Sequence, residues 1–335
     1  MEFNDIALAA AALFPAIVLF IYIYKKDRAE KEPLWLMLLL FAVGAASTVP
    51  AGEAESIVIP IFQNIFSGGS VAENNVIYIE TVPFYIYTFL ENFIGIALAE
   101  EGFKLIFLYI ATFRSKHFNS LFDGMLYAGV VSLGFAALEN IMYAFEYGWA
   151  TVLMRMIVSV PGHMFFGVIM GYFYSFWNIF RNVDKLEKDA ISRGMLPASR
   201  KKINTKRQMM LTLLVPVLGH GFFDFCLSTD ETFFLVVFYI FLAGLYIFCF
   251  RRINKFSMAD ITYDSLLITV FLKRNPELLR KLSAVVSSEE LRCRLGTGTV
   301  EKYRNVLNDY YILTYDEDPN VETPIEALLD EATQD

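Results

Sequence analysis

Seven long stretches of mostly apolar residues constrain this chain more than any other feature of its sequence. They lie at 5–24, 34–51, 84–113, 121–145, 150–180, 208–227 and 233–250. Each is long enough to cross a hydrocarbon core about 30 Å thick as a helix. The chain is 56% hydrophobic and 19% charged, whereas soluble domains carry about 25% charged residues. The sequence therefore predicts an all-α, polytopic membrane protein with about seven transmembrane helices.

Basic residues occur in every second connection between these stretches. Lys or Arg follows the first, third, fifth and seventh stretch, and the connection 181–207 alone holds nine of them. The alternate segments 1–4, 52–80, 146–150 and 228–232 contain neither residue. Because Lys and Arg are enriched in cytoplasmic loops, this alternation predicts an amino terminus outside the cell membrane and a carboxyl terminus in the cytoplasm.

Composition divides the chain into three predicted parts. Residues 1–255 contain all seven stretches and form the membrane domain. Residues 256–315 form a cytoplasmic helical extension, large enough to bind a cytoplasmic partner and without a catalytic pattern. Residues 316–335 form an acidic tail that is expected to be disordered. Helical periodicity in the extension covers 260–272, 276–286 and 299–312.

Proline and glycine predict local features of three stretches. The outer segment 52–80 is apolar around Pro60, which suits an interfacial helix, a re-entrant piece or a lid, and these three alternatives stay open. Pro161-Gly162 predicts a kink in the stretch 150–180. Small residues also allow close approach of neighbouring helices, and we expect it at Gly134, Gly167 and Gly171.

Ionisable and polar residues inside the apolar stretches are the strongest functional signal. A charge at the centre of a bilayer costs at least about 2.5 kcal/mol, so such residues usually mark function. Four different stretches place Glu or His at a similar depth, and convergence on one polar cavity explains this pattern better than isolated buried charges. The residues concerned are Glu100, Glu101, Lys104, Glu139, Asn140, His163, His220 and Asp224.

Spacing within the helices allows both functional and structural interpretations. Glu100 and Lys104 are four residues apart and share a helix face, so they can form a purely structural ion pair. His220 and Asp224 have the same spacing. Asp224 can orient the imidazole, both side chains can hold one metal ion, or the pair can clamp two helices together. Arg155 is close enough to the outer surface for its head group to reach water, which favours a structural role.

Three classes of function use such a cluster. A carboxylate beside a neutral imidazole can activate water as a general base, and a divalent metal ion held by His and carboxylates can do the same. A proton- or cation-coupled transporter uses the same residue types as a relay. In a non-catalytic membrane receptor or scaffold, the cluster would be structural. The residues alone do not separate these classes, and nothing in them indicates nucleic-acid binding.

Four short motifs in fixed order narrow the choice among these classes of function. They are Glu100-Glu101-Gly102-Phe103-Lys104, the segment from Phe122-Asp123-Gly124 to Glu139-Asn140, His163 within 161–167, and Gly219-His220-Gly221-Phe222-Phe223-Asp224. Over about residues 85–250 the chain resembles the PrsW family of intramembrane proteases of bacteria and archaea. This family is related to the prenyl-protein (CAAX) endopeptidases, whose motif ends in His where this chain has Glu139. That departure favours the PrsW branch over prenyl-protein processing.

The resemblance implies an activity and a set of roles. It implies a multi-pass protein of a prokaryotic cell membrane that cleaves a membrane-anchored protein, such as an anti-sigma factor or another single-span regulator. Glu100 or Glu101 would activate water, and His163 and His220 would bind a metal ion or stabilise the oxyanion. Metal dependence stays open, with one zinc-like divalent ion as the candidate cofactor. Lys104 and Asn140 would support the site, and the candidate metal ligands are His163, His220, Asp224 and Glu139.

Overall fold

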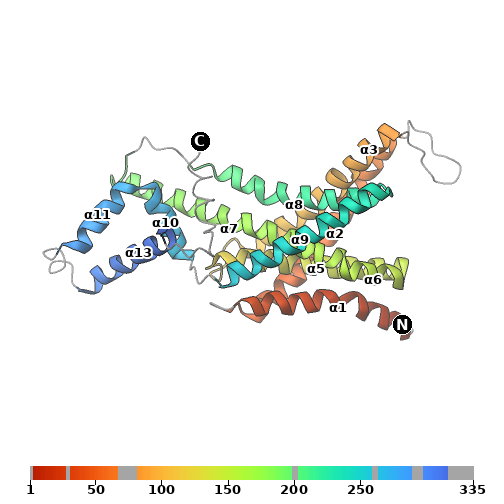
Figure 1. Ribbon diagram of the computed structural model, residues 1–335, viewed down its shortest axis with the longest axis horizontal. Coiled ribbons are helices and arrows are strands. Elements are labelled where there is room, and N and C mark those ends of the chain that lie inside the picture. Colours follow the sequence, from red (N-terminus) through yellow and green to blue (C-terminus); the bar gives the residue numbers. More distant parts are fainter. Residues whose placement is uncertain are drawn as a thin grey trace. The chain divides into compact units, whose positions relative to one another are not determined.

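A computed structural model describes residues 3–27, 31–66, 81–197, 203–258, 263–288 and 297–315 of the chain. These residues form helices and connections, with no β-strand among them (Figure 1). The helices in the amino-terminal half are α1 (Phe3–Lys26), α2 (Leu34–Phe66), α3 (Thr81–Leu90), the π-helix η1 (Glu91–Ala97), α4 (Leu98–Thr112) and α5 (Leu121–Tyr147). Those that follow are α6 (Trp149–Ile157), α7 (Ser159–Ser192), α8 (Thr205–Ser228), α9 (Thr232–Met258), α10 (Tyr263–Arg274), α11 (Pro276–Ser287) and α13 (Thr297–Tyr315).

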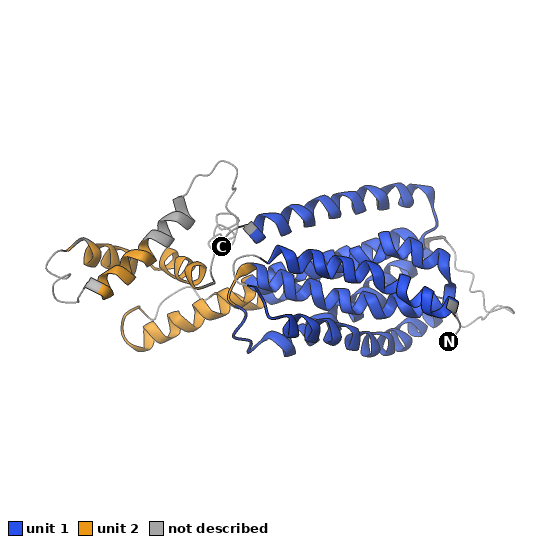
Figure 2. Cartoon of the chain, turned by 90° about the horizontal axis from the view of Figure 1, so that it is seen from below, with its two compact units in different colours: residues 1–118, 122–175, 208–260 blue, residues 119–121, 176–207, 261–335 orange. Residues whose placement is uncertain are grey.

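The chain consists of two compact units (Figure 2). The first unit contains residues 1–118, 122–175 and 208–260, and the second contains residues 119–121, 176–207 and 261–335. Both units are therefore assembled from separate parts of the chain, whereas the sequence predicted consecutive domains. The carboxyl-terminal part of α7 belongs to the second unit and its amino-terminal part to the first.

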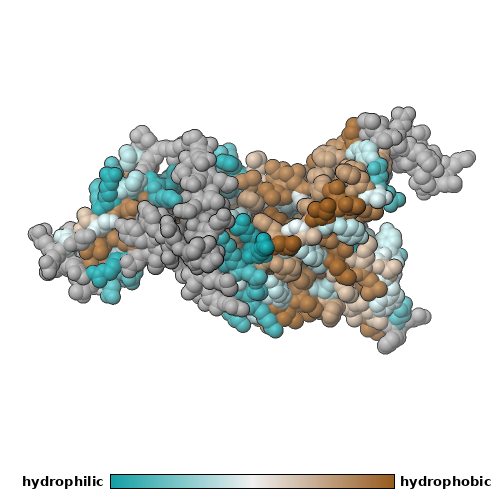
Figure 3. All heavy atoms as spheres, viewed as in Figure 1, coloured by the Kyte–Doolittle hydropathy of each residue, from teal (hydrophilic) through white to brown (hydrophobic). Residues whose placement is uncertain are grey.

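The prediction of an all-helical, polytopic membrane fold is confirmed. Six helical stretches among the described residues are long and apolar enough to cross a membrane. The predicted stretch 84–113 is not among these six, although α3, η1 and α4 follow one another without a break from Thr81 to Thr112. Hydrophobic residues gather on the face of the molecule that Figure 3 shows. The exposed large apolar side chains of the first unit include Phe233, Ile240 and Ile110. Such a surface suits contact with lipid.

Two helices differ in detail from the predicted stretches. Helix α2 does not end near residue 51 but continues through Pro60 to Phe66, so the first part of the outer segment extends a transmembrane helix. Residues 67–80 lie outside the described part. The predicted break near Pro161 falls slightly earlier, between α6 and α7 at Val158. Proline is tolerated in the first helical turn and has no N–H to donate to the preceding turn, so Pro161 lies at the start of the new helix.

Helix α5 is the centre of the first unit, and 94% of its apolar window is buried. Glycines let other helices approach its backbone closely. A Cβ atom on Gly134 would lie 1.9 Å from the carbonyl oxygen of Phe41 in α2, and one on Gly171 of α7 would lie 2.0 Å from that of Gly124. A Cβ on Gly167 would lie 2.4 Å from Ser132 Oγ. The expected close approach at these glycines is confirmed, and it places α2 and α7 against α5.

Three helices of the second unit occupy the region where helical periodicity was predicted. Helices α10, α11 and α13 pack against one another. Glu187, near the end of α7, accepts hydrogen bonds from Arg274 Nε at 2.9 Å and Nη2 at 3.3 Å, and from Asn275 Nδ2 at 3.3 Å. This ion pair connects the end of α7 to the α10–α11 junction. The predicted tail 316–335 lies outside the described residues, and the domain boundaries stay predictions.

Candidate active site

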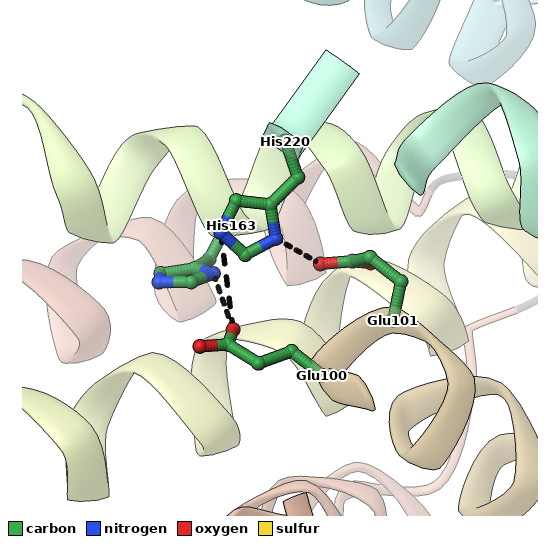
Figure 4. A group of neighbouring side chains, drawn as sticks. All are labelled: Glu100, Glu101, His163 and His220. Atoms are coloured by element: carbon green, nitrogen blue, oxygen red, sulfur yellow. Dashed lines mark hydrogen bonds and ion pairs between the residues drawn. The ribbon is translucent and has the colours of Figure 1, made fainter. Parts of the chain in front are cut away.

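Three helices of the first unit bring four ionisable side chains together. Helix α4 supplies Glu100 and Glu101 directly after the π-helix η1, α7 supplies His163, and α8 supplies His220. Figure 4 shows the four side chains pointing toward one another, with Glu100 and Glu101 on the same helix. All four are buried. The expected convergence on one polar site therefore holds for these residues, and π-helical turns are frequent at functional sites.

The two glutamates share a lysine from their own helix. Lys104 Nζ lies 3.0 Å from Glu100 Oε2 and 2.8 Å from Glu101 Oε1. Lys104 and Glu101 are 0% exposed. Lys104 Nζ also lies 3.1 Å from His163 Nδ1 and 4.0 Å from the centre of the Phe135 ring. Buried charges need such partners, so Lys104 joins the acidic pair to the histidine on α7.

Each histidine has a carboxylate on its Nε2 atom. His163 Nε2 lies 2.9 Å from Glu139 Oε2, and His220 Nε2 lies 3.1 Å from Asp224 Oδ2. The Nδ1 atoms instead lie near the glutamates of α4, with His220 Nδ1 2.9 Å from Glu101 Oε1 and His163 Nδ1 3.8 Å from Glu100 Oε2. A carboxylate on one ring nitrogen fixes the orientation of the ring and favours a proton there. Glu139 and Asp224 therefore lie on the Nε2 sides of the imidazoles of His163 and His220.

Aromatic contacts hold the two imidazoles in place. The rings of His163 and His220 meet edge to face with centroids 5.0 Å apart. Phe166 stacks on His220 with centroids 5.1 Å apart and an angle of 15° between the planes. Phe135 lies 5.7 Å from His163, between centroids. Packing on both histidines limits their rotation, which suits groups that must act in one orientation.

Arg155 differs from its expected role near the surface. It is buried, and Nη2 lies 2.6 Å from Glu139 Oε2. Its Nε donates to Asn140 Oδ1 at 3.2 Å, and Asn140 Nδ2 donates to the Ala12 carbonyl at 2.8 Å. Because Glu139 offers a partner inside the protein, the arginine does not need to reach water. Asn140 connects α1 to Arg155 and does not line the cavity that opens beside the cluster.

A cavity of about 430 Å³ opens beside the cluster. Glu100, His163 and His220 line it, whereas Glu101 and Lys104 lie behind its wall. The lining also contains polar side chains that sequence reasoning did not single out. Glu55 was missed because the sequence placed it in an outer loop, although it has the spacing of a continued α2 helix. The other polar additions are Thr48, Asn92, Tyr143, Glu146, Ser159 and Ser228.

The cluster fits a metal ion by its donor atoms and burial. One ligand atom from each of Glu100, Glu101, His163 and His220 lies within 4.8 Å of the other three. Two imidazole nitrogens and carboxylate oxygens are donors that zinc accepts, and carboxylates behind the histidines are common in such sites. Glu101 Oε2 is buried and makes no hydrogen bond to any residue that the structure describes, so it has capacity for a further cation.

The fold and site together define a class of protein. Apolar helices enclose a cavity of about 430 Å³ whose wall carries a carboxylate and two oriented imidazoles, residue types that suit a hydrolase site inside a membrane.

Comparison with known proteins identifies the family. Residues 32–249 match the model of the PrsW family intramembrane metalloproteases, and this chain belongs to that family. The region contains all of the residues of the cluster. The chain is therefore a multi-pass membrane protease of prokaryotic type, and its substrates are proteins.

Curated relatives agree with this assignment. The chain is 29% identical over 252 residues to Protease PrsW of Oceanobacillus iheyensis, covering 75% of this chain and 97% of that protein. Protease PrsW of Clostridioides difficile is 26% identical over 73% of this chain and 89% of its own length. Protease PrsW of Bacillus subtilis is 27% identical over 70% of this chain and 90% of its own length. No solved structure matches the chain.

Proposed function

We propose that Glu100, Glu101, His163 and His220 form the active site of this protease. The observation that carries the proposal is their meeting, buried and from three helices, at the wall of one cavity. The proposed substrate is a membrane-anchored protein, such as an anti-sigma factor or another single-span regulator. Membership of a protease family favours this function over a coupled transporter or a non-catalytic receptor.

Glu100 is the proposed general base, and Glu101 the residue that positions it. Glu100 lines the cavity, so a water molecule there can give a proton to its carboxylate. Glu101 lies behind the wall and is held by Lys104 and His220. Lys104 contacts both carboxylates. Sequence alone left the choice between the two glutamates open.

The histidines are proposed to act through their Nδ1 sides. Glu139 and Asp224 orient the rings from the Nε2 sides, which leaves the Nδ1 atoms toward the glutamates. Glu101, His163 and His220 would hold a divalent ion of the zinc type, and Glu100 would lie beside it as the base. When bound, such an ion lowers the pKa of a coordinated water molecule and polarises a carbonyl group. Glu139 and Asp224 then support the ligands and are not ligands themselves.

Orientation and domain roles complete the proposal. The alternation of basic residues supports an amino terminus outside and a carboxyl terminus in the cytoplasm. Residues 1–255 would then be the protease domain and 256–315 a cytoplasmic extension that can bind a partner. The curated relative from Oceanobacillus iheyensis is covered almost completely by 75% of this chain, which supports a separate role for the extension.

The proposal is tested by profiling protein amino termini in membrane fractions. Cells express either the unchanged protein or the Glu100→Gln/Glu101→Gln double variant at equal levels. We expect new termini in or beside transmembrane segments only with the unchanged protein. The same termini with both forms would overturn the assignment of the site. Matched amounts of folded protein in both samples separate a loss of chemistry from a loss of folding.

A second measurement tests the metal site without an activity assay. Elemental analysis of the purified, folded protein is expected to find about one divalent ion per chain. The Glu100→Gln/Glu101→Gln variant is expected to lose it. An Arg251→Gln variant, changed at an exposed residue of α9, serves as the control that keeps the ion. Equal metal content in all three proteins would contradict the proposed ligand set.

A further inference from the structure

A second cavity lies on the surface of the first unit, between the start of α2 and the end of α4. It has a volume of about 650 Å³ and is separate from the protease cavity, with which it shares no lining residue. Its lining consists of Trp35, Leu36, Leu39, Tyr109, Ile110, Ala111, Phe113, Arg114, Ser115, Lys116 and His117. The established protease activity gives this groove no role.

The walls of the groove are apolar and face outward. Trp35 is 60% exposed, Leu39 46% and Ile110 74%. Trp35 and Leu39 are four residues apart on α2, and Ile106 and Ile110, also exposed, have the same spacing on α4. Each pair therefore forms a ridge along its helix. In a membrane-spanning bundle such ridges meet acyl chains, and tryptophan is typical of the level of the lipid head groups.

One end of the groove is basic. Arg114 and Lys116 follow the end of α4, and both are exposed. Neither forms an ion pair with any residue that the structure describes, and the lining residues include no Asp or Glu. Ser115 adds a hydroxyl group between them, and His117 contacts Trp35 edge to face with centroids 6.0 Å apart. The nearest acidic group to this imidazole is the buried Glu32, whose Oε2 lies 3.9 Å from His117 Nδ1.

We propose that this groove binds one anionic phospholipid. Its acyl chains would lie along the α2 and α4 ridges, and its phosphate would contact Arg114, Ser115 and Lys116. Charge complementarity carries the choice, because an apolar groove with unpaired basic residues at one end matches a molecule with a hydrocarbon part and a negative head group. The acidic lining of the protease cavity, with Glu55 and Glu146 among its residues, offers no such match.

Basic residues at helix ends also occur for reasons of topology alone, and the chain contains a matched control. Arg251 and Arg252 lie near the end of α9, and Arg252 Cζ lies 5.2 Å from the Phe248 ring centre. Neither arginine lines the groove. Two charges can therefore be removed from either place, and only removal from the groove should change lipid selectivity.

Tryptophan fluorescence provides a direct probe. The chain has three tryptophans, so a Trp149→Phe/Trp177→Phe variant of the full chain keeps only Trp35 in the groove. This variant is placed in phosphatidylcholine nanodiscs that contain equal small fractions of brominated phosphatidylglycerol or brominated phosphatidylcholine. We expect stronger quenching of Trp35 by the anionic lipid. In the Arg114→Gln/Lys116→Gln variant, the preference for the anionic lipid should fall roughly five-fold for each basic residue neutralised. In the Arg251→Gln/Arg252→Gln variant, this preference should stay unchanged.

A second variant leaves all charges in place. Ala111→Phe adds a ring to the groove wall and is expected to abolish the preference by excluding the lipid. Equal quenching by both brominated lipids, or an unchanged preference in both groove variants, would overturn the proposal. An equal loss of this preference in the Arg251→Gln/Arg252→Gln control would show that anionic lipid is attracted to basic surface residues in general. That result would also overturn the proposal. Metal content and substrate cleavage, measured on the same samples, report on the protease site independently.

Discussion

An ion pair of the first unit and an ion pair of the second unit differ in how far they are enclosed. In the first unit, Glu101 and Lys104 are completely enclosed by apolar helices and contact each other at 2.8 Å. In the second unit, Arg193 and Asp189 also pair at 2.9 Å, but their side chains are 68% and 54% exposed. A solvated pair at this spacing contributes little to stability. An enclosed pair persists only where further partners offset the loss of water.

The same contrast appears in the family comparison. The family model ends at residue 249, so α10, α11 and α13 lie beyond it. The buried charges of the cluster fall within the matched region, and helices α10, α11 and α13 do not. Buried charged residues therefore indicate the position of the protease site better than exposed charged residues do.

Single substitutions of the two buried glutamates should have the largest effect. Glu100→Gln is expected to lower cleavage by about 10²–10⁴-fold, since it removes the proposed base from the cavity wall. Glu101→Gln should also lower cleavage, with loss of metal, because it contacts His220. The rate of cleavage of a single-span substrate in proteoliposomes measures both. Normal cleavage by the Glu100→Gln variant would show that another residue is the general base.

The carboxylates behind the histidines should matter less. Asp224→Asn and Glu139→Gln keep the shape of each side chain but weaken its hold on the imidazole. We expect activity or metal affinity to fall by about 10–100-fold for each. Titration of the metal-free protein with zinc measures the affinity. A loss as complete as that of Glu100→Gln would instead make these carboxylates ligands or catalytic groups.

Packing at the centre of the first unit comes next. Gly134→Ala places a Cβ atom 1.9 Å from the Phe41 carbonyl oxygen, so α2 and α5 must separate. We expect a loss of about 2 kcal/mol in stability, seen as a lower melting temperature in detergent. Gly244→Ala is the control, because a Cβ there meets no atom within 4 Å. Equal melting temperatures for the two variants would contradict the close approach of these helices.

The second unit should show the smallest effect on cleavage. Arg274→Ala removes the hydrogen bonds to Glu187 and is expected to cost about 1 kcal/mol locally. Hydrogen exchange in α10 and α11 should increase while cleavage by the first unit stays unchanged. Arg193→Ala, at the exposed pair, should change neither quantity. Loss of cleavage in Arg274→Ala would show that the second unit takes part in the activity.

The sequence alone determined the class of fold and most of the candidate site. Apolar length and the positions of Lys and Arg are local properties, and they predicted the transmembrane stretches without any knowledge of packing. Helical rise per residue also placed Glu101, His163 and His220 at one depth. Depth along a helix follows from residue number because the rise is constant.

Only the tertiary structure decided which side chains meet. Rotation of a helix about its axis and its neighbours depend on packing, for example at Gly134 and Gly171, and residue number does not reveal them. Packing turned Arg155 inward to Glu139, continued α2 so that Glu55 reaches the cavity, and placed Glu101 behind Glu100. These outcomes depend on contacts between residues far apart in sequence, which the energy of the whole bundle determines.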